Sequence, residues 1–145
     1  MRTAITLAWR GVFLALVLAL LTAAEAGAVQ VVNDGRGGET LDLQKLREKG
    51  KTTVIEFYSP FCPPCLRLAP LLEELSRKRP DLAIKKVNIN RPEAKGIDWK
   101  SPLAQQYGIR SVPHFVVFSP RGKATEGRAA FSQVQKWLEE AGLLK

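Results

Sequence analysis

The sequence predicts a single α/β domain with a central mixed β-sheet and helices on both of its faces. β-rich and helical stretches alternate along most of the chain, which indicates parallel strands joined by crossover helices. A short turn joins the last two strands, which makes that pair antiparallel. The 145 residues leave room for one domain of ordinary size. The apolar share of 46% and the charged share of 25% exclude the disordered and fibrous classes.

The first half of the domain is predicted to contain two strands and two helices. Residues 29–33 are β-rich, and a turn-prone stretch separates them from a short helical pattern that ends at Gly50. Residues 52–58 are β-branched and aromatic, as in a strand buried in the middle of a sheet. From 63 to 79 the leucines recur with helical spacing, which predicts a long helix that Pro70 should kink.

The second half is predicted to contain a strand, a polar loop, a short helix, a hairpin and a closing helix. In chain order the ranges are 82–89, 90–101, 103–107, 115–119 with 124–128, and 132–141. The Pro-Arg-Gly turn at 120–122 joins the two strands of the hairpin. Val134, Trp137 and Leu138 would face inward from the closing helix.

The first 28 residues are predicted to be an export signal outside the fold. Arg2 and Arg10 give a basic start, residues 11–24 carry no charge, and Ala26-Gly27-Ala28 is a small-x-small cleavage pattern. The 14 uncharged residues fall short of the roughly 18 to 20 that span a membrane. We therefore expect cleavage before Val29 and a mature domain at 29–145, with an uncleaved membrane anchor as the alternative.

The mature chain is basic. Of 22 basic and 14 acidic residues, only Arg2, Arg10 and Glu25 precede residue 29, so 20 against 13 remain and the net charge is +7. One tight basic run, 77–79, closes a predicted helix, where cations meet the macrodipole favourably. No nucleic-acid motif accompanies the charge, so we expect a solvated surface and no nucleic-acid partner. Attraction to acidic partners or anionic lipid stays open.

The chain contains two cysteines, and they form Cys62-Pro63-Pro64-Cys65 where a predicted strand meets a predicted helix. A thiol at a helix start meets unpaired N–H groups and the positive end of the helix dipole, both of which favour the reactive thiolate. Cys62 is therefore the expected nucleophile. Cys65, one turn further on, would attack the mixed disulfide and release the product.

Four further stretches carry a family pattern: the strand at 54–58, the Ala-Pro spacing at 65–70, the segment at 107–113 that ends in Val-Pro, and Gly127 followed by the helix near Trp137. Together with the cysteine pair, they make nearly the whole mature chain resemble thioredoxins. The resemblance implies a thioredoxin fold, a thiol-disulfide oxidoreductase with a redox-active disulfide, and a part in cell redox homeostasis. It implies no cofactor beyond that disulfide, and a monomer suffices.

The resemblance also assigns a client-binding surface. Pro113 matches the family's cis-proline, which lies against the disulfide. Val112 would present its backbone to a client strand, and Phe61, Pro63, Pro64 and His114 would line the same surface. The alternative for Pro113 is an ordinary edge or turn proline.

Glu56 stands where thioredoxins usually carry a buried Asp beneath the second cysteine. A carboxyl group in an apolar strand has a raised pKa, which would suit it to exchange the proton of Cys65. Because Glu is longer than Asp, its carboxyl would reach a different place. A strand-edge glutamate in solvent is the alternative.

Other departures from the family pattern predict a different partner surface. Phe61 stands where thioredoxin has Trp, Leu66 replaces the usual cation, and residues 93–100 lengthen a loop. Trp99 in that loop would either contact a partner or cover the core.

His114, the one histidine of the sequence, would either tune Cys62 or point outward. With Cys62 and Cys65 it would also offer three soft-metal ligands. Soft-metal sites usually need a further ligand, so we expect no metal.

The two prolines predict the direction of electron flow. Pro63 and Pro64 lack N–H groups, so the Cys62 thiolate loses donors and the reduced form is less stabilised, which favours a reductant. This resembles exported thioredoxin-like proteins of the bacterial periplasm, which reduce client proteins with electrons from a membrane thiol donor. The alternatives are a disulfide donor or isomerase, and a non-catalytic peptide-binding or metal-carrier module.

Overall fold

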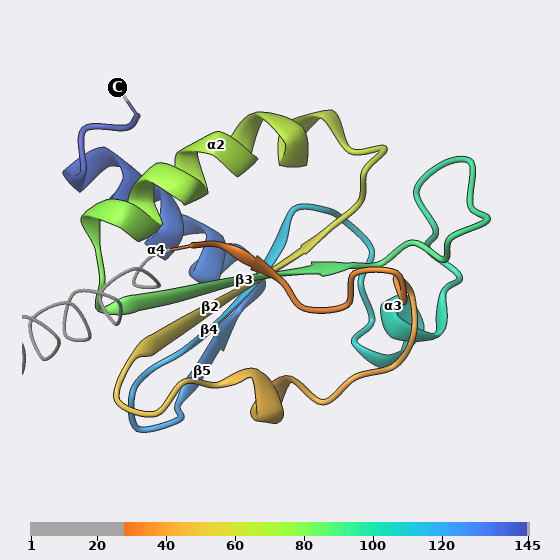
Figure 1. Cartoon of the computed structure of the whole chain (residues 1–145), viewed down its shortest axis with the longest axis horizontal. Coiled ribbons are helices and arrows are strands. Elements are labelled where there is room, and N and C mark those ends of the chain that lie inside the picture. Colours follow the sequence, from red (N-terminus) through yellow and green to blue (C-terminus); the bar gives the residue numbers. More distant parts are fainter. Residues whose placement is uncertain (1–27, 145) are drawn as a thin grey trace, which may run out of the picture.

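The computed structural model describes residues 28–144, which form one five-stranded sheet with helices on both faces (Figure 1). The strands are β1 (Gln30–Val31), β2 (Thr52–Tyr58), β3 (Leu82–Asn88), β4 (His114–Phe118) and β5 (Ala124–Glu126). Their spatial order is β1-β3-β2-β4-β5. β1, β3 and β2 are parallel, β4 is antiparallel to β2, and β5 is antiparallel to β4. The predicted mixed sheet is confirmed.

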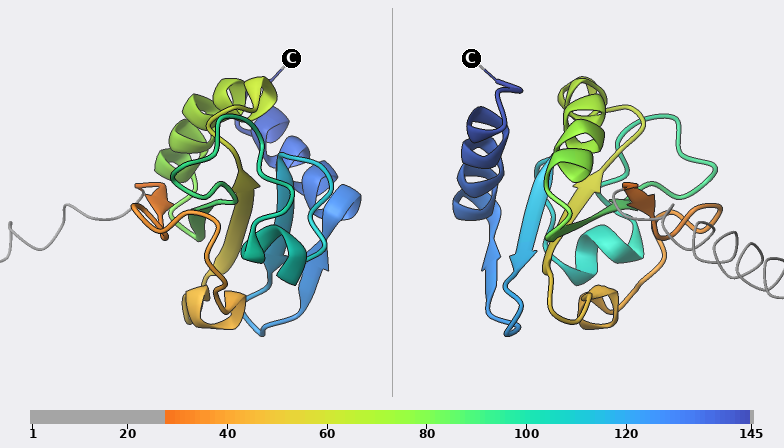
Figure 2. Two further views of the ribbon diagram at one scale, coloured as in Figure 1. Left: turned by 90° about the vertical axis from the view of Figure 1, so that its right-hand side faces the viewer. Right: turned by 60° about the vertical axis from the view of Figure 1, so that its left-hand side comes forward.

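The helices divide between the two faces of the sheet. α2 (Pro63–Lys78) and α4 (Gly127–Glu140) lie side by side on one face, and α3 (Pro102–Gln106) lies on the other (Figure 2). The predicted long helix is confirmed almost to the residue, and it continues through Pro70. Its two N-terminal prolines have no N–H to leave unpaired, which suits the first turn.

The strand β2 supplies both halves of the core. Ile55 and Phe57 belong to the cluster that α3 completes with Leu103 and Ala104. Val54 belongs to the opposite cluster, under α2 and α4. Because side chains alternate along a strand, Glu56 points to the same face as Val54 and therefore toward α2.

The predicted start of the closing helix is wrong. We expected a strand at 124–128 and a helix from 132, whereas β5 ends at Glu126 and α4 begins at Gly127. Gly127 has a φ of +63°, a left-handed conformation that ends the strand and turns the chain. Val134 and Leu138 are buried as predicted, and Trp137 is half-buried beneath the guanidinium of Arg79.

The predicted elements before β2 are shorter than expected. The strand expected at 29–33 pairs only at Gln30–Val31. The helical pattern that ends at Gly50 forms only a single 3₁₀ turn, η1 (Leu43–Leu46). The Asp42 side chain caps its start by accepting a hydrogen bond from the N–H of Gln44. The 3₁₀ turn stops at Leu46 because Arg47 adopts an extended conformation and the N–H of Glu48 bonds the Thr53 hydroxyl instead.

The predicted export signal lies outside the described residues, except for Ala28. Within residues 28–144, no helix has the length and apolar character that a membrane crossing requires.

Leu72 tests the packing of α2 on the sheet. Leu72→Ala should lower the free energy of unfolding by about 2–5 kcal/mol, because it opens a cavity at a fully buried position. Leu66→Ala makes the same chemical change on the same helix at a side chain that is 57% exposed, and should cost less than about 1 kcal/mol. Urea denaturation of the oxidised proteins measures both, and equal losses would contradict the assigned packing.

Candidate active site

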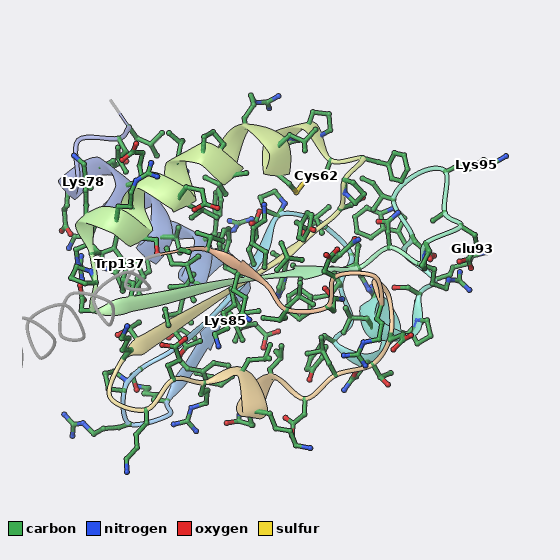
Figure 3. All side chains as sticks on the ribbon, in the orientation of Figure 1. Cys62, Lys78, Lys85, Glu93, Lys95 and Trp137 are labelled. Atoms are coloured by element: carbon green, nitrogen blue, oxygen red, sulfur yellow. A yellow bond between two sulfur atoms is a disulfide. The ribbon has the colours of Figure 1, made fainter. Side chains whose placement is uncertain are left out.

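The disulfide Cys62–Cys65 lies at the N-terminus of α2, directly after β2. The Cα atoms of the two cysteines are 5.3 Å apart, and both residues are almost fully buried. Figure 3 shows Cys62 beneath the first turn of α2, with Lys78 at the other end of this helix. The predicted junction of strand, cysteine pair and helix is therefore present.

A buried serine, missed in the sequence analysis, shapes the turn that leads into the site. The Ser59 hydroxyl accepts a hydrogen bond from the N–H of Phe61 at 3.1 Å. The Ser59 carbonyl accepts another from the N–H of Cys62, also at 3.1 Å. These bonds reverse the chain and leave the Phe61 side chain 46% exposed. Serine is a common turn residue, and its place between Tyr58 and Pro60 was the available signal.

Cys62 is the N-cap residue of α2. Its Sγ accepts a hydrogen bond from the N–H of Cys65 at 3.2 Å. An N-cap side chain can receive bonds from the second and third helical residues. The second is Pro64, which has no N–H, so the Cys65 N–H is the one helix donor for this sulfur.

The segment before β4 approaches the disulfide from the other side. The peptide bond between Val112 and Pro113 is cis, as the family pattern led us to expect. The carbonyl oxygen of Val112 lies 3.6 Å from Sγ of Cys62. Cys62 and Val112 are thus brought together, as a surface that guides a client strand to the sulfur requires.

Glu56 is fully buried on the α2 side of the sheet, so the alternative of a solvent-exposed strand-edge glutamate is wrong. Neither carboxyl oxygen has a hydrogen-bond partner, and the nearest cation is Lys86, whose Nζ lies 3.5 Å from Oε2. Burial raises the pKa of Glu56 to about 7, although Lys86 acts in the opposite direction. At neutral pH the carboxyl can therefore both accept and return a proton.

Lys86 was missed in the sequence analysis. It lies opposite Glu56 in the parallel register of β2 and β3, is largely buried, and places its ammonium 4.4 Å from the centre of the Tyr58 ring. The signal was a lysine inside the β-rich run 82–89. Recognising its partner would have required the register of two strands that a long helix separates.

His114 is half-buried and packs against Phe57. Its ring lies edge-on to Phe57 at 5.9 Å, and its Nε2 is buried without a hydrogen-bond partner, 3.8 Å from a Glu126 oxygen. Burial lowers the pKa of His114, and Glu126 partly offsets this effect. Residues 28–144 contain no group of three His, Cys, Asp or Glu side chains arranged to hold a metal. Tuning of Cys62 by His114 stays a prediction.

A hollow of about 230 Å³ lies beside the cis-proline. It is lined by Ser111, Pro113, His114, Gly127, Arg128 and Phe131. The start of α4 at Gly127 thus brings the helix to the edge of the candidate site.

The loop between β3 and α3 lies near the turn into α2 in every view (Figures 1 and 2). Arg91 clamps its two ends through two hydrogen bonds to the Asp98 carboxylate, at 2.7 and 3.0 Å. The buried Asn90 bonds the Gly96 carbonyl inside the loop. Trp99, at the end of the loop, is 37% exposed and belongs to neither core cluster, so its contact with a partner stays a prediction.

Comparisons with known proteins place this geometry among thioredoxins. The family profile described as Thioredoxin matches residues 42–140. A thioredoxin-like protein of Fusarium culmorum is 41% identical over 93 residues, which cover 61% of this chain and 69% of that protein. Thioredoxin H5 of Oryza sativa subsp. japonica is 34% identical over 91 residues, 62% of this chain and 60% of that protein. The long form of spinach chloroplast thioredoxin f aligns with a TM-score of 0.54 at 23% identity, over 82% of this chain and 90% of that one, which shows the fold alone.

The buried carboxyl predicts an unusual pH dependence of stability. The pKa of Glu56 rises from 4.5 to about 7 on folding, so the folded protein holds this proton more tightly than the unfolded chain. The resulting stabilisation is full below pH 4.5 and is lost as the pH rises to about 7. Relative to Glu56→Gln, the wild type should lose on the order of 3 kcal/mol across that window.

Urea denaturation of the oxidised wild type and Glu56→Gln between pH 4 and pH 8 measures this difference. Lys86→Met serves as a second variant, because loss of the cation should move the window to higher pH. Parallel stability profiles for wild type and Glu56→Gln would contradict the assigned titration.

Proposed function

The chain belongs to the thioredoxin family and is a thiol-disulfide oxidoreductase with its active-site disulfide at Cys62–Cys65, and we propose that it works as an exported reductant of client disulfides. Family membership implies client proteins with disulfides in general. The direction of electron flow, the compartment and the electron donor are the parts that we propose.

The single hydrogen bond from the helix start to Cys62 carries the proposal. The Cys65 N–H donates to Sγ, and the prolines at the two preceding helical positions offer nothing. A thiolate at Cys62 is therefore stabilised less than it would be with a full set of helix N–H donors. Because a weakly stabilised dithiol gives up its electrons readily, this arrangement supports a reducing potential.

The proposed reaction uses residues of this chain and balances as a dithiol-disulfide exchange. The Cys62 thiolate attacks one sulfur of the client disulfide, whose S–S bond breaks, and the released client thiolate takes up a proton. Glu56 accepts the proton of Cys65, and the Cys65 thiolate then attacks Sγ of Cys62 and releases the second client sulfur. Two electrons pass to the client, and the Cys62–Cys65 disulfide forms.

Each turnover needs an external dithiol that returns two electrons to the pair. Exported compartments are kept oxidising, so a reductant there depends on such a supply. A membrane thiol carrier is the proposed donor, and the bacterial periplasm the proposed location. The support for export is the basic, uncharged and small-residue pattern of residues 1–28.

The reduction potential of the Cys62–Cys65 pair tests the direction. Equilibration of the domain at 29–145 with glutathione or dithiothreitol buffers should give a value near that of thioredoxin, about −270 mV. A value near −120 mV, typical of strong oxidants, would reject the reductant and favour disulfide donation.

Pro64→Ala tests the hydrogen-bond argument itself. The new N–H at the second helical position should bond the Cys62 thiolate, lower its pKa and raise the reduction potential by about 30 mV, which corresponds to roughly one hydrogen bond of 1.4 kcal/mol. Pro63→Ala is the matched control, because the N–H of the first helical position is not one that an N-cap side chain accepts. Equal shifts in the two variants would attribute the effect to proline stiffness and reject the argument.

Processing of the full chain tests export. When the 145-residue chain is expressed in a bacterium, we expect the intact mass of the periplasmic product to begin at Val29. A full-length product held in the membrane fraction with its domain exported would indicate the anchored form. A full-length product in the cytoplasm would contradict export.

A further inference from the structure

The chain segments that frame the disulfide contain no carboxylate. Residues 57–72 run from the end of β2 through the turn into α2, and residues 99–125 run through α3, the cis-proline segment and β4. Neither stretch holds an Asp or a Glu, and residues 127–138 of α4 hold none either. Glu56, which precedes the first stretch, is buried and cannot meet a partner.

Two exposed arginines flank the cis-proline. Arg110 lies three residues before Pro113, next to Ile109, whose N–H is fixed to the Ala104 carbonyl at 2.8 Å. Arg128 lines the hollow beside Pro113 from the first turn of α4. Within residues 28–144, no carboxylate lies at ion-pair distance from either guanidinium. Both charges are therefore available to a partner.

Glu126 opposes them beside the cis-proline, and in the loop between β3 and α3 the carboxylates Glu93 and Asp98 are balanced by Arg91 and Lys95. Glu126 is exposed and lies 3.8 Å from Nε2 of His114. Against two arginines, a single carboxylate leaves the surroundings of the cis-proline positive.

The cations at the far end of α2 are engaged in the fold. Arg77 pairs with Glu74 at 2.6 Å, and Arg79 pairs with Asp81 at 2.7 Å. Lys78 bonds the carbonyl of Ala141 at 3.0 Å. Figure 3 shows Lys78 at the opposite end of α2 from Cys62. The basic run at 77–79 is thus occupied by contacts within the protein, whereas Arg110 and Arg128 are exposed and flank the cis-proline.

Two large apolar side chains next to the cysteine pair in the chain are exposed. Phe61 is 46% exposed and Leu66 is 57% exposed, on either side of the two cysteines in the chain. A client strand that pairs with Val112 would place the residues next to its own cysteine against these apolar side chains. Its residues a few positions further along would then lie near the two arginines.

We propose that this surface selects client disulfides that lie in acidic segments, with Asp or Glu within a few residues of the reacting cysteine. The proposal rests on the proposed function, since it names the clients of the same site. Arg110 and Arg128 attract the acidic segment and raise its association rate, and salt screens the attraction.

Single-turnover kinetics with matched peptides test the proposal. Each peptide carries one cysteine in a mixed disulfide with 2-mercaptoethanol, flanked by either four Glu or four Lys residues. The rate with reduced protein is divided by the rate of the same peptide with dithiothreitol, which removes intrinsic differences in disulfide reactivity. At low ionic strength, the Glu peptide should react about ten-fold faster than the Lys peptide on this scale. At about 0.5 M NaCl the ratio should fall to about two-fold or less.

Charge-reversal variants locate the effect. In the variant Arg110→Glu/Arg128→Glu, the ratio of the Glu-peptide rate to the Lys-peptide rate should fall to about one or below. Arg121→Glu/Lys123→Glu makes the same change in net charge at the turn between β4 and β5, the other end of β4 from Pro113, and should keep the ratio. Circular dichroism and thermal denaturation verify that both variants fold.

Three results would overturn the proposal: a wild-type ratio near one, a ratio unaffected by salt, or equal loss of the ratio in both double variants. If Arg110→Glu/Arg128→Glu kept the peptide ratio but lost binding to phosphatidylglycerol vesicles, these arginines would serve a membrane surface instead. A strongly oxidising reduction potential would reject the reductant without changing the ratio, so the two failures are distinguishable.

Discussion

The junction between β2 and α2 is the constraint on which the site depends. Ser59 turns the chain at the end of the central strand, and Cys62 then caps the helix with its own sulfur. The sulfur is therefore part of the secondary structure, so its position is fixed by the same bond that starts the helix. Because Pro63 and Pro64 occupy the first helical positions, the helix begins without other donors near the sulfur. One local arrangement sets both the geometry of the pair and its electrostatic surroundings.

At Glu56 and Lys86, the stability of the fold and proton transfer require different things of the same buried pair. A buried carboxyl without hydrogen bonds destabilises the fold when it is ionised. An ammonium 3.5 Å away reduces this cost without removing it, and the pKa settles at about 7. A closer, fully bonded ion pair would hold the carboxyl ionised and unable to return a proton. The imperfect pair thus keeps both protonation states accessible near neutral pH.

Local patterns predicted the parts of the molecule that depend on neighbours in the chain. The helix at 63–78 follows from its leucine spacing and its initial prolines, and the cysteine pair from its place before that helix. The start of α4 was not predictable in this way, because a backbone conformation at Gly127 decides it. The contact of Glu56 with Lys86 depends on the register of separate strands, which one sequence does not reveal. The candidate site was therefore predicted at the cysteine pair and, through the family pattern, at the cis-proline beside it, and it was missed at Ser59 and at the pairing of β2 with β3.

The clamp between Arg91 and Asp98 has a consequence for the thermodynamics of association. The two guanidinium bonds and the buried Asn90 hold the loop before α3 in one shape during folding. The conformational entropy of that loop is lost once, when the chain folds, and not again at each encounter. A partner that binds beside the turn into α2 therefore meets a loop that is already ordered. Contacts with this loop contribute to affinity without an entropic cost for ordering it.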